Sequence, residues 1–281
     1  MTVDAVEIDR WERIAASSED TSLAEGALLI AAEEYHDLDI DGYLQRIDRM
    51  ADTLRRRLRS DISATEALLA LNRYLFEELG FSGNADDYYD ARNSYLNDVI
   101  DRKLGIPITL AVLYIEIGRR IGLSLHGVSF PSHFLVKCVL REGAIILDPY
   151  ARGASLGLED LQQRLRAIVK DVELDPTVLN AMLAPASPRD IFARMLRNLR
   201  AIHLSRGDRL KALNASTGII TLVPGAADEY RDRAQLYFEL ECFRAALADF
   251  HTYLRLKPDA VDSETVTRQI AELEPIAARL N

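Results

Sequence analysis

The feature of the sequence that most restricts its fold is the apolar run from Ile108 to Ile115, which directly follows Gly105-Ile106-Pro107. Proline suits the first turn of a helix, because the N–H that it lacks would have no partner inside the helix there. The run therefore predicts a helix over Ile108–Ile121 that is apolar on nearly all sides. Such a helix must be covered by other elements, so we expect it at the centre of a domain.

The elements expected on either side of this helix differ in kind. Apolar residues recur at three- and four-residue steps in Tyr43–Leu58 and Thr65–Leu79, which predicts two helices, and a shorter helix is expected over Asp90–Lys103. After Gly122 the pattern changes to strand-like runs over residues 125–130, 134–140 and 144–147. A helical N-terminal part followed by an antiparallel sheet predicts an α+β domain.

A second domain is indicated by a proline- and serine-rich stretch at residues 184–188 and by a repeat beyond it. Pro224 and Pro258 mark a period of 34 residues, which is typical of tetratricopeptide (TPR) helix pairs. We therefore predict two domains. Residues 1–185 form the α+β domain, and residues 186–281 form an all-α array of two repeats that a final helix caps.

The charge of the chain is negative and unevenly distributed. Of its residues, 44 are acidic and 34 basic, which gives a net charge of −10. Residues 1–185 carry 20 basic and 31 acidic residues, or −11, whereas residues 186–281 carry 14 and 13, or +1. A surface of this kind repels phosphate backbones and anionic lipid, so we expect neither a nucleic-acid nor a membrane partner.

The two cysteines, Cys138 and Cys242, are too few for a disulfide framework or a cysteine-rich zinc site. We therefore expect a reducing, cytoplasmic setting. The acidic N-terminus lacks the basic-then-apolar order of a signal peptide, and no apolar run approaches the ~20 residues of a membrane helix. No cofactor is expected.

Several motifs resemble those of a known family. They are Asn93-Ser94-Tyr95-Leu96, Gly105-Ile106-Pro107-Ile108 and Pro131-Ser132-His133-Phe134-Leu135, together with the C-terminal repeats. This combination is similar to a bacterial family that joins a transglutaminase-like domain to TPRs and is associated by name with invasion-gene regulation. The likeness runs from about Leu23 to about Leu273. A glycine is common in that family where Ser132 stands here, and the Gly-Ile-Pro-Ile run is itself typical of it.

The resemblance implies a papain-type helix-on-sheet core with a vestigial catalytic triad. In the wider transglutaminase-like superfamily a cysteine begins the buried helix, a histidine lies on the next strand and an aspartate on the one after. A helix N-terminus lowers the pKa of such a thiol, the imidazole takes its proton, and the carboxylate orients the imidazole. His133 and Asp148 match the last two members, whereas Pro107 occupies the nucleophile position and cannot attack.

Other residues are weaker substitutes for the missing nucleophile. Cys138 is five residues from His133 on one predicted strand, so it should face the other way and serve as a small buried hydrophobe. Cys242 is interpreted as packing within the repeats. Thr109 and Ser132 lie nearer the expected cleft, but a hydroxyl needs a base in hydrogen-bond contact.

Two further groups of residues have both a structural and a functional interpretation. Asn93, Ser94 and Tyr95 belong to a polar and aromatic stretch that could line the cleft above Pro107. In the structural interpretation, Asn93 and Ser94 cap or staple the entry into the following helix. His126, His133 and Asp148 could in principle hold a metal ion, but the spacing of the two histidines argues against it, so no metal site is expected.

These residues favour a non-catalytic role, that of a pseudoenzyme in protein interaction or regulation. A protein or peptide partner would bind the TPR groove, the degenerate cleft or both. One alternative is a cysteine-independent hydrolase or acyltransferase in which His133 and Asp148 activate a hydroxyl or a water. The other is a purely structural scaffold, in which a histidine and a carboxylate only join two strands.

Overall fold

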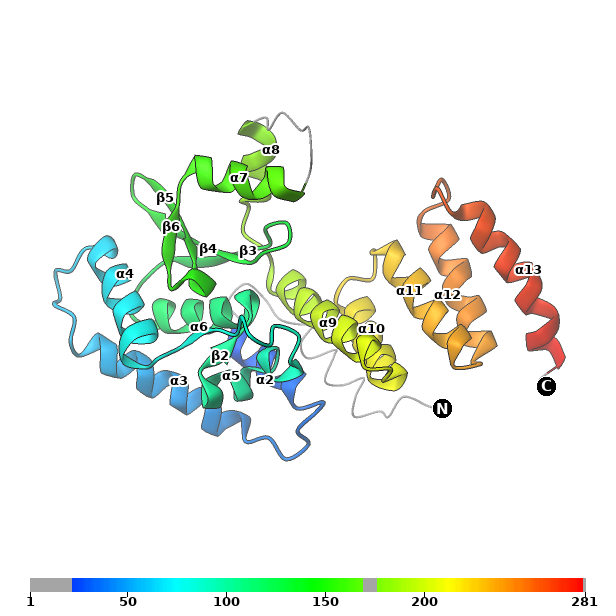
Figure 1. Cartoon of the computed structure of the whole chain (residues 1–281), viewed down its shortest axis with the longest axis horizontal. Helices are drawn as coiled ribbons and strands as arrows, with labels where there is room; N and C mark the ends of the chain where they lie inside the picture. Colours follow the sequence, from blue (N-terminus) through cyan, green and yellow to red (C-terminus); the bar gives the residue numbers. More distant parts are fainter. Residues whose placement is uncertain (1–21, 169–175, 280–281) are drawn as a thin grey trace. The chain divides into compact units, whose positions relative to one another are not determined.

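Helix α6 (Pro107–Arg120) is buried along most of its length, as its apolar sequence requires. It belongs to the first of two compact units in the computed structural model, which describes residues 22–168 and 176–279 (Figure 1). The first unit ends at Ile191, and the second begins at Phe192, inside α9 (Pro188–Ser205). The domain boundary expected at residue 185 stays a prediction.

A four-stranded antiparallel sheet lies against α6. Its strands follow one another in chain order: β3 (Leu125–Val128), β4 (Leu135–Leu140), β5 (Gly143–Asp148) and β6 (Ala154–Leu156). Helix and sheet approach closely because residue 118 is a glycine; a Cβ there would come within 2.2 Å of the Leu125 side chain. The predicted α+β class is confirmed, although the three-residue strand β6 was too short to be predicted.

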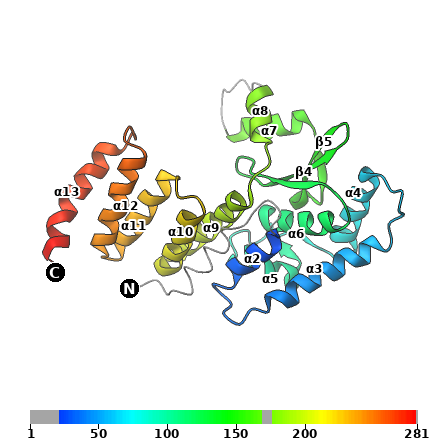
Figure 2. The same cartoon turned by 180° about the vertical axis from the view of Figure 1, so that it is seen from behind.

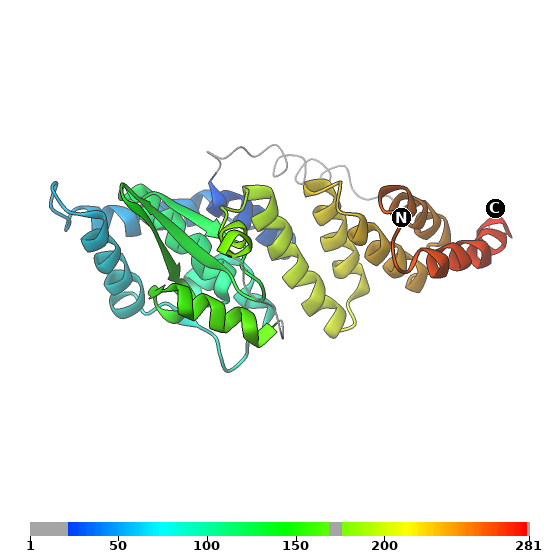
Figure 3. The ribbon, with the colours of Figure 1, turned by 90° about the horizontal axis from the view of Figure 1, so that it is seen from above.

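The other face of the sheet is covered by α7 (Leu158–Ile168) and α8 (Pro176–Met182), and Figures 1 and 3 show α7 alongside the strands. A buried apolar cluster joins the two layers and includes Leu135 of β4, Ile146 of β5 and Leu165 of α7. Alternate residues of β5 therefore face α7, and Asp148, two residues after Ile146, shares that face.

Helices α2 (Leu23–Ala31), α3 (Ile40–Arg55) and α5 (Leu96–Arg102) pack against α6 on the side away from β4 and β5 (Figure 2). The buried carboxylate of Glu116 in α6 accepts a hydrogen bond of 2.7 Å from the backbone N–H of Leu23. It thereby fixes the first turn of α2 to the central helix.

Two helices differ from the sequence prediction. The helix expected over Thr65–Leu79 is α-helical only in α4 (Ala64–Asn72) and continues as the π-helical turn η1 (Arg73–Glu78). The helix expected over Asp90–Lys103 is interrupted and consists of the 3₁₀ turn η2 (Ala91–Asn93) and α5. The short strand β1 (Ser82–Gly83) follows η1 and pairs in parallel with β2 (Leu104–Gly105), which follows α5; the sequence predicted neither strand.

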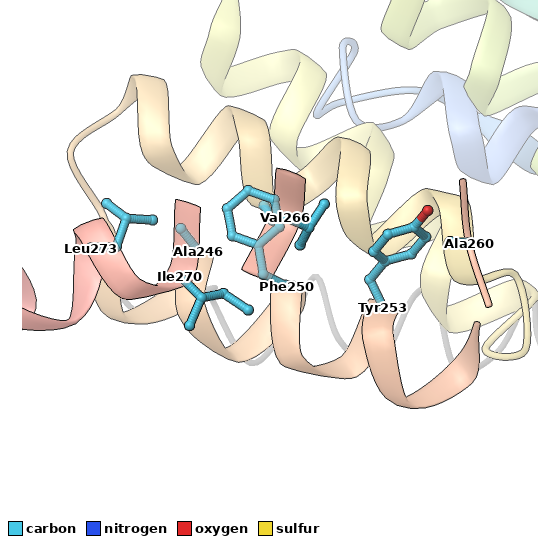
Figure 4. Packing of buried hydrophobic residues seen from close by; sticks show 8 residues of the cluster. Ala246, Phe250, Tyr253, Ala260, Val266, Ile270 and Leu273 are labelled. Atoms are coloured by element: carbon cyan, nitrogen blue, oxygen red, sulfur yellow. The ribbon is translucent and has the colours of Figure 1, made fainter. Parts of the chain in front are cut away.

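The second unit is all-α, as expected of TPRs. Its helices after α9 are α10 (Arg209–Leu222), α11 (Ala227–Glu239), α12 (Phe243–Leu256) and α13 (Ser263–Arg279). Figure 4 shows Phe250 and Tyr253 of α12 packed with Val266, Ile270 and Leu273 of α13. The final helix α13 therefore packs on α12.

Candidate functional site

Asp148 is the last residue of β5 and the centre of a hydrogen-bonded cluster. Its Oδ1 lies 2.9 Å from His133 Nε2 and also accepts from the backbone N–H groups of Tyr150 and Ala151, at 3.1 and 3.3 Å. The carboxylate thus caps the 3₁₀ turn η3 (Pro149–Ala151) while it holds the imidazole. Asp148 is only 1% exposed, so the interaction is shielded from water.

A third side chain, Arg164 of α7, completes the cluster. Its Nη2 donates to Asp148 Oδ2 at 2.8 Å. Burial alone would raise the pKa of Asp148, but the hydrogen bonds and charges of His133 and Arg164 outweigh burial and lower that pKa. Asp148 is therefore ionised. Arg164 was not predicted as a site residue. The only feature of the sequence that points to it is its position next to Leu165, which the amphipathic pattern of the helix places on the buried side.

His133 lies in the turn before β4, not on the strand as predicted. Its side chain is 18% exposed, and its ring makes an edge-on contact with Tyr150, with 6.1 Å between ring centroids. The preceding Ser132 has a φ of 54° and is exposed. This left-handed conformation ends the turn and explains why glycine suits the position. The structure therefore joins His133 to Asp148, as the sequence predicts, but by way of a turn.

Pro107 is buried at the first position of α6, and the residue that organises this helix start is Thr109. The Thr109 hydroxyl accepts from the backbone N–H of Ile106 at 3.1 Å and lies 2.7 Å from the carbonyl oxygen of Asn93, to which it donates. Thr109 is 0% exposed. The hydroxyl has only one proton, and it donates that proton to the Asn93 carbonyl. Thr109 therefore links η2 to the start of α6.

A short series of contacts connects the His133 cluster to the start of α6. The Tyr150 ring covers Gly83 of β1 so closely that a Cβ on this glycine would lie 2.4 Å from the ring. Gly83 pairs with Gly105 of β2, two residues before Pro107. Tyr150 and the two glycines were not among the predicted site residues, because their role depends on strands of only two residues.

Asn93 is fully buried and stabilises the loop that precedes it. Its amide donates to the carbonyl of Asp87 at 2.7 Å, and its Oδ1 accepts from Asn84 Nδ2 at 3.1 Å. The prediction that Asn93 or Ser94 caps the following helix is wrong, since the N-cap of α5 is Tyr95 and no side chain caps it. Whether these residues line a cleft stays a prediction.

The hydroxyl of Ser94 and the Oδ1 of Asn97 are buried and have no hydrogen-bond partner in the described structure. Tyr95 is buried too, and its ring meets Tyr35 edge-on at 5.7 Å between centroids. Burial, followed by the charge of Glu34, raises the pKa of the Tyr95 hydroxyl far above its usual value. Tyr95 is therefore neutral and supplies no proton acceptor.

The two cysteines lie in different environments. Cys138 of β4 is 0% exposed and pairs with Leu125 on one side and Ile145 on the other. Burial raises the pKa of its thiol, which disfavours the reactive thiolate. The predicted buried position of Cys138 is confirmed. For Cys242 the packing interpretation is wrong, because this residue is exposed at the start of α12, where the turn from α11 faces solvent.

His126 lies on β3 beside the hydroxyl of Ser124, whose Oγ is 3.3 Å from Nε2, while His133 is paired with Asp148. Within residues 22–168 and 176–279, no three histidine, cysteine or carboxylate side chains come close enough to hold a metal ion.

Comparison with known families adds to this geometry. Residues 41–197, which carry both α6 and the His133 cluster, match the model of the transglutaminase-like superfamily. The chain belongs to this superfamily. Residues 199–271 match the model of the tetratricopeptide repeat. The resemblance to a bacterial family that combines these two parts is therefore confirmed.

Several bacterial relatives of this transglutaminase-like chain are similar to it over most of their length. A UPF0162 protein of Xylella fastidiosa is 38% identical over 96% of this chain and 97% of the relative. A UPF0162 protein of Pseudomonas aeruginosa is 31% identical over 94% of this chain and 95% of the relative. Protein SirB1 of Salmonella typhimurium is 23% identical over 88% of this chain and 91% of the relative. No solved structure gives a significant match. None of the described helices has the length and apolar character needed to cross a bilayer.

Proposed function

We propose that this transglutaminase-like protein acts by binding a protein partner and does not carry out acyl transfer. The observation that carries the proposal is Pro107 at the first position of α6, where the superfamily pattern expects the nucleophilic cysteine. A proline side chain has no atom that can attack a carbonyl group. His133 and Asp148, which match the other two members of the superfamily pattern, lie in hydrogen-bond contact.

The chain offers no thiol to replace the one that is missing. Cys138 is buried with a raised pKa, and Cys242 is an exposed residue of the second unit, whereas Pro107 and His133 belong to the first. Thr109 is buried and its proton is given to a backbone carbonyl. Ser132 is exposed, but its neighbour His133 is turned toward Asp148.

The His133 cluster has a sufficient structural role in this proposal. Asp148 joins the turn before β4, the end of β5 and helix α7, and it also caps η3. The carboxylate of Asp148 binds Arg164 as well as His133. In a catalytic triad the charge of the aspartate stabilises the imidazolium ion, whereas here part of that charge is neutralised by Arg164. We therefore assign the cluster to stability of the fold.

The TPR unit supplies the surface for a partner. Helix pairs of this kind form grooves that bind peptide segments. An aromatic pair at the turn from α11 to α12, Phe238 and Phe243, has ring centroids 6.0 Å apart, and Phe238 is an exposed large apolar residue. Exposed aromatic residues are favoured as anchors in protein interfaces.

The test compares partner capture by full-length variants, with quantitative mass spectrometry as the readout. We expect Phe238→Ser to lose the specific partner and His133→Gln to retain it. Leu69→Ser, which changes an exposed residue of the first unit, is the matched control. The proposal fails if His133→Gln alone loses the partner, or if none of the captured proteins depends on Phe238.

A second candidate, a hydrolase, is favoured by one observation. His133 keeps part of its ring exposed beside an ionised carboxylate, which is the environment of a general base that activates water. Hydrolysis of an amide or ester that disappears in His133→Ala, while the folded structure is retained, would select this candidate.

A further inference from the structure

A cavity of about 360 Å³ lies among α3, η1 and α5. None of the residues of the His133 cluster lines it. Its charged lining residues are Arg46, Arg49 and Lys103, and its apolar ones include Met50, Leu79 and Ile100. All three charges are positive, although residues 1–185 as a whole carry a net charge of −11. The cavity is thus a basic site within an acidic domain.

Lys103 has a backbone conformation that its side chain disfavours. It is the C-cap of α5 with a φ of 64°, and its N–H donates to the carbonyl of Val99. Glycine is the usual residue at such a left-handed helix end, because it has no Cβ penalty. A lysine here costs backbone strain that glycine would avoid, so replacement by glycine should be tolerated by the fold.

The ammonium group of Lys103 lies 4.2 Å from the centroid of the Phe81 ring. Among the described residues it makes no ion pair. The nearby carboxylate of Asp101 is already engaged, since it accepts from Arg46 at 2.5 Å and from the Tyr43 hydroxyl at 2.7 Å. Burial and then the charge of Arg46 lower the pKa of Lys103, and the charge of Asp101, which acts in the other direction, does not outweigh them.

Arg49 adds a second charge of the same kind. It follows Arg46 by three residues, so both project from one face of α3, and its guanidinium has no ion-pair partner in the described parts of the chain. Asp101 neutralises the charge of Arg46. The charges of Arg49 from α3 and Lys103 from the end of α5 therefore remain in the cavity.

We propose that this cavity binds a small organic phosphate, with the phosphoryl group between Arg49 and Lys103 and the apolar part of the ligand against Met50, Leu79 and Ile100. Two cations without an ion pair among the described residues match the charge of a phosphate monoester dianion. A volume of 360 Å³ is in the range of small-ligand pockets. The site is independent of the partner-binding function proposed above.

The test is isothermal titration calorimetry, which measures the binding of phenyl phosphate to the full chain. Phenyl phosphate combines a dianionic phosphoryl group with one apolar ring. Lys103→Gly is the most informative variant, because glycine fits the left-handed conformation and the melting temperature should not fall. Arg49→Ala removes the second cation. Arg55→Ala is the matched control, since it removes a positive charge from the opposite side of α3, where Arg55 pairs with Asp52.

We expect phenyl phosphate to bind the wild type and the Arg55→Ala variant alike, and each cavity variant to bind about tenfold more weakly, as for loss of one charge-assisted hydrogen bond. Benzoate, with one negative charge, should bind more weakly than phenyl phosphate, and phenol should not bind measurably. The proposal is overturned if phenyl phosphate does not bind at millimolar concentration, if phenol or benzoate binds equally well, or if Lys103→Gly binds like the wild type.

Discussion

The guanidinium of Arg164 donates to Asp148 Oδ2 at 2.8 Å, on the oxygen that His133 leaves unoccupied. The two carboxylate oxygens thus serve different partners, one from the turn before β4 and one from α7. Asp148 therefore connects the sheet to helix α7, which covers it.

Removal of Arg164 should destabilise the fold. We expect Arg164→Gln to lower the free energy of unfolding by about 2 kcal/mol, because Asp148 would lose a charge-assisted hydrogen bond while remaining buried. Urea unfolding at pH 7 measures this. Arg166→Gln, an exposed neighbour on the same helix, is the control and should unfold like the wild type.

The same cluster predicts an acid dependence of stability. The pKa of Asp148 is lowered in the folded state, so its contribution is fully present above the unfolded value of about 3.9 and is lost as the pH falls through the folded pKa. In Arg164→Gln this loss should be smaller. Unfolding curves at pH 6, 4 and 3 measure it, and an equal acid dependence in the two proteins would refute the role of Arg164.

Ser132→Gly should stabilise the protein. Ser132 has a φ of 54° and an exposed side chain, so glycine removes the left-handed penalty without loss of packing. We expect a gain of about 0.5 kcal/mol in the free energy of unfolding, after the higher entropy of the unfolded glycine chain is subtracted. Ser132→Ala should give no such gain; a gain of equal size there would show that the backbone conformation is not the cause.

The hydroxyl of Thr109 should contribute to stability. Thr109→Val keeps the shape but leaves the N–H of Ile106 and the carbonyl of Asn93 without their partner, so we expect a loss of about 2 kcal/mol. Thr109→Ser retains the hydroxyl and should lose less. Thermal or chemical unfolding decides the order of the two variants. If Thr109→Val proved as stable as the wild type, the joint between η2 and α6 would not depend on this hydroxyl.

The second unit contains a testable ion pair. Arg233 of α11 makes two hydrogen bonds to Asp249 of α12, at 2.7 and 2.9 Å, and both side chains are largely buried. Arg233→Met leaves the charge of Asp249 buried and unpaired, so the free energy of unfolding should fall by about 3 kcal/mol. The double variant Arg233→Met, Asp249→Leu should recover much of the loss, and a double variant no more stable than the single one would contradict this explanation.

The sequence predicted the central helix and the His133–Asp148 pair because each depends on strong signals. An apolar run after a proline defines α6, and two motifs of the superfamily place the histidine and the aspartate. Arg164 could not be predicted, because its role arises only when α7 packs on the sheet. The position of His133 in a turn was also missed, since the apolar run of β4 continues up to Phe134 without a visible break.

The cavity around Lys103 could not be predicted from sequence patterns either, because it also depends on residues that come together only in the folded chain. Arg46 and Arg49 are one helical turn apart, so their sequence spacing places them together, but Lys103 joins them only because the folded chain brings it to the lining of the same cavity. Its left-handed conformation has no sequence signal, because a lysine at a helix end is ordinary.

The central claim is that the superfamily's acyl-transfer chemistry is absent from this chain. The most direct measurement incubates the full chain with an unfolded protein substrate, such as casein, and a fluorescent primary amine, and follows label incorporation and fragment masses. We predict that the wild type gives no more label or cleavage than His133→Ala. Incorporation or cleavage by the wild type that is lost in His133→Ala would contradict the claim.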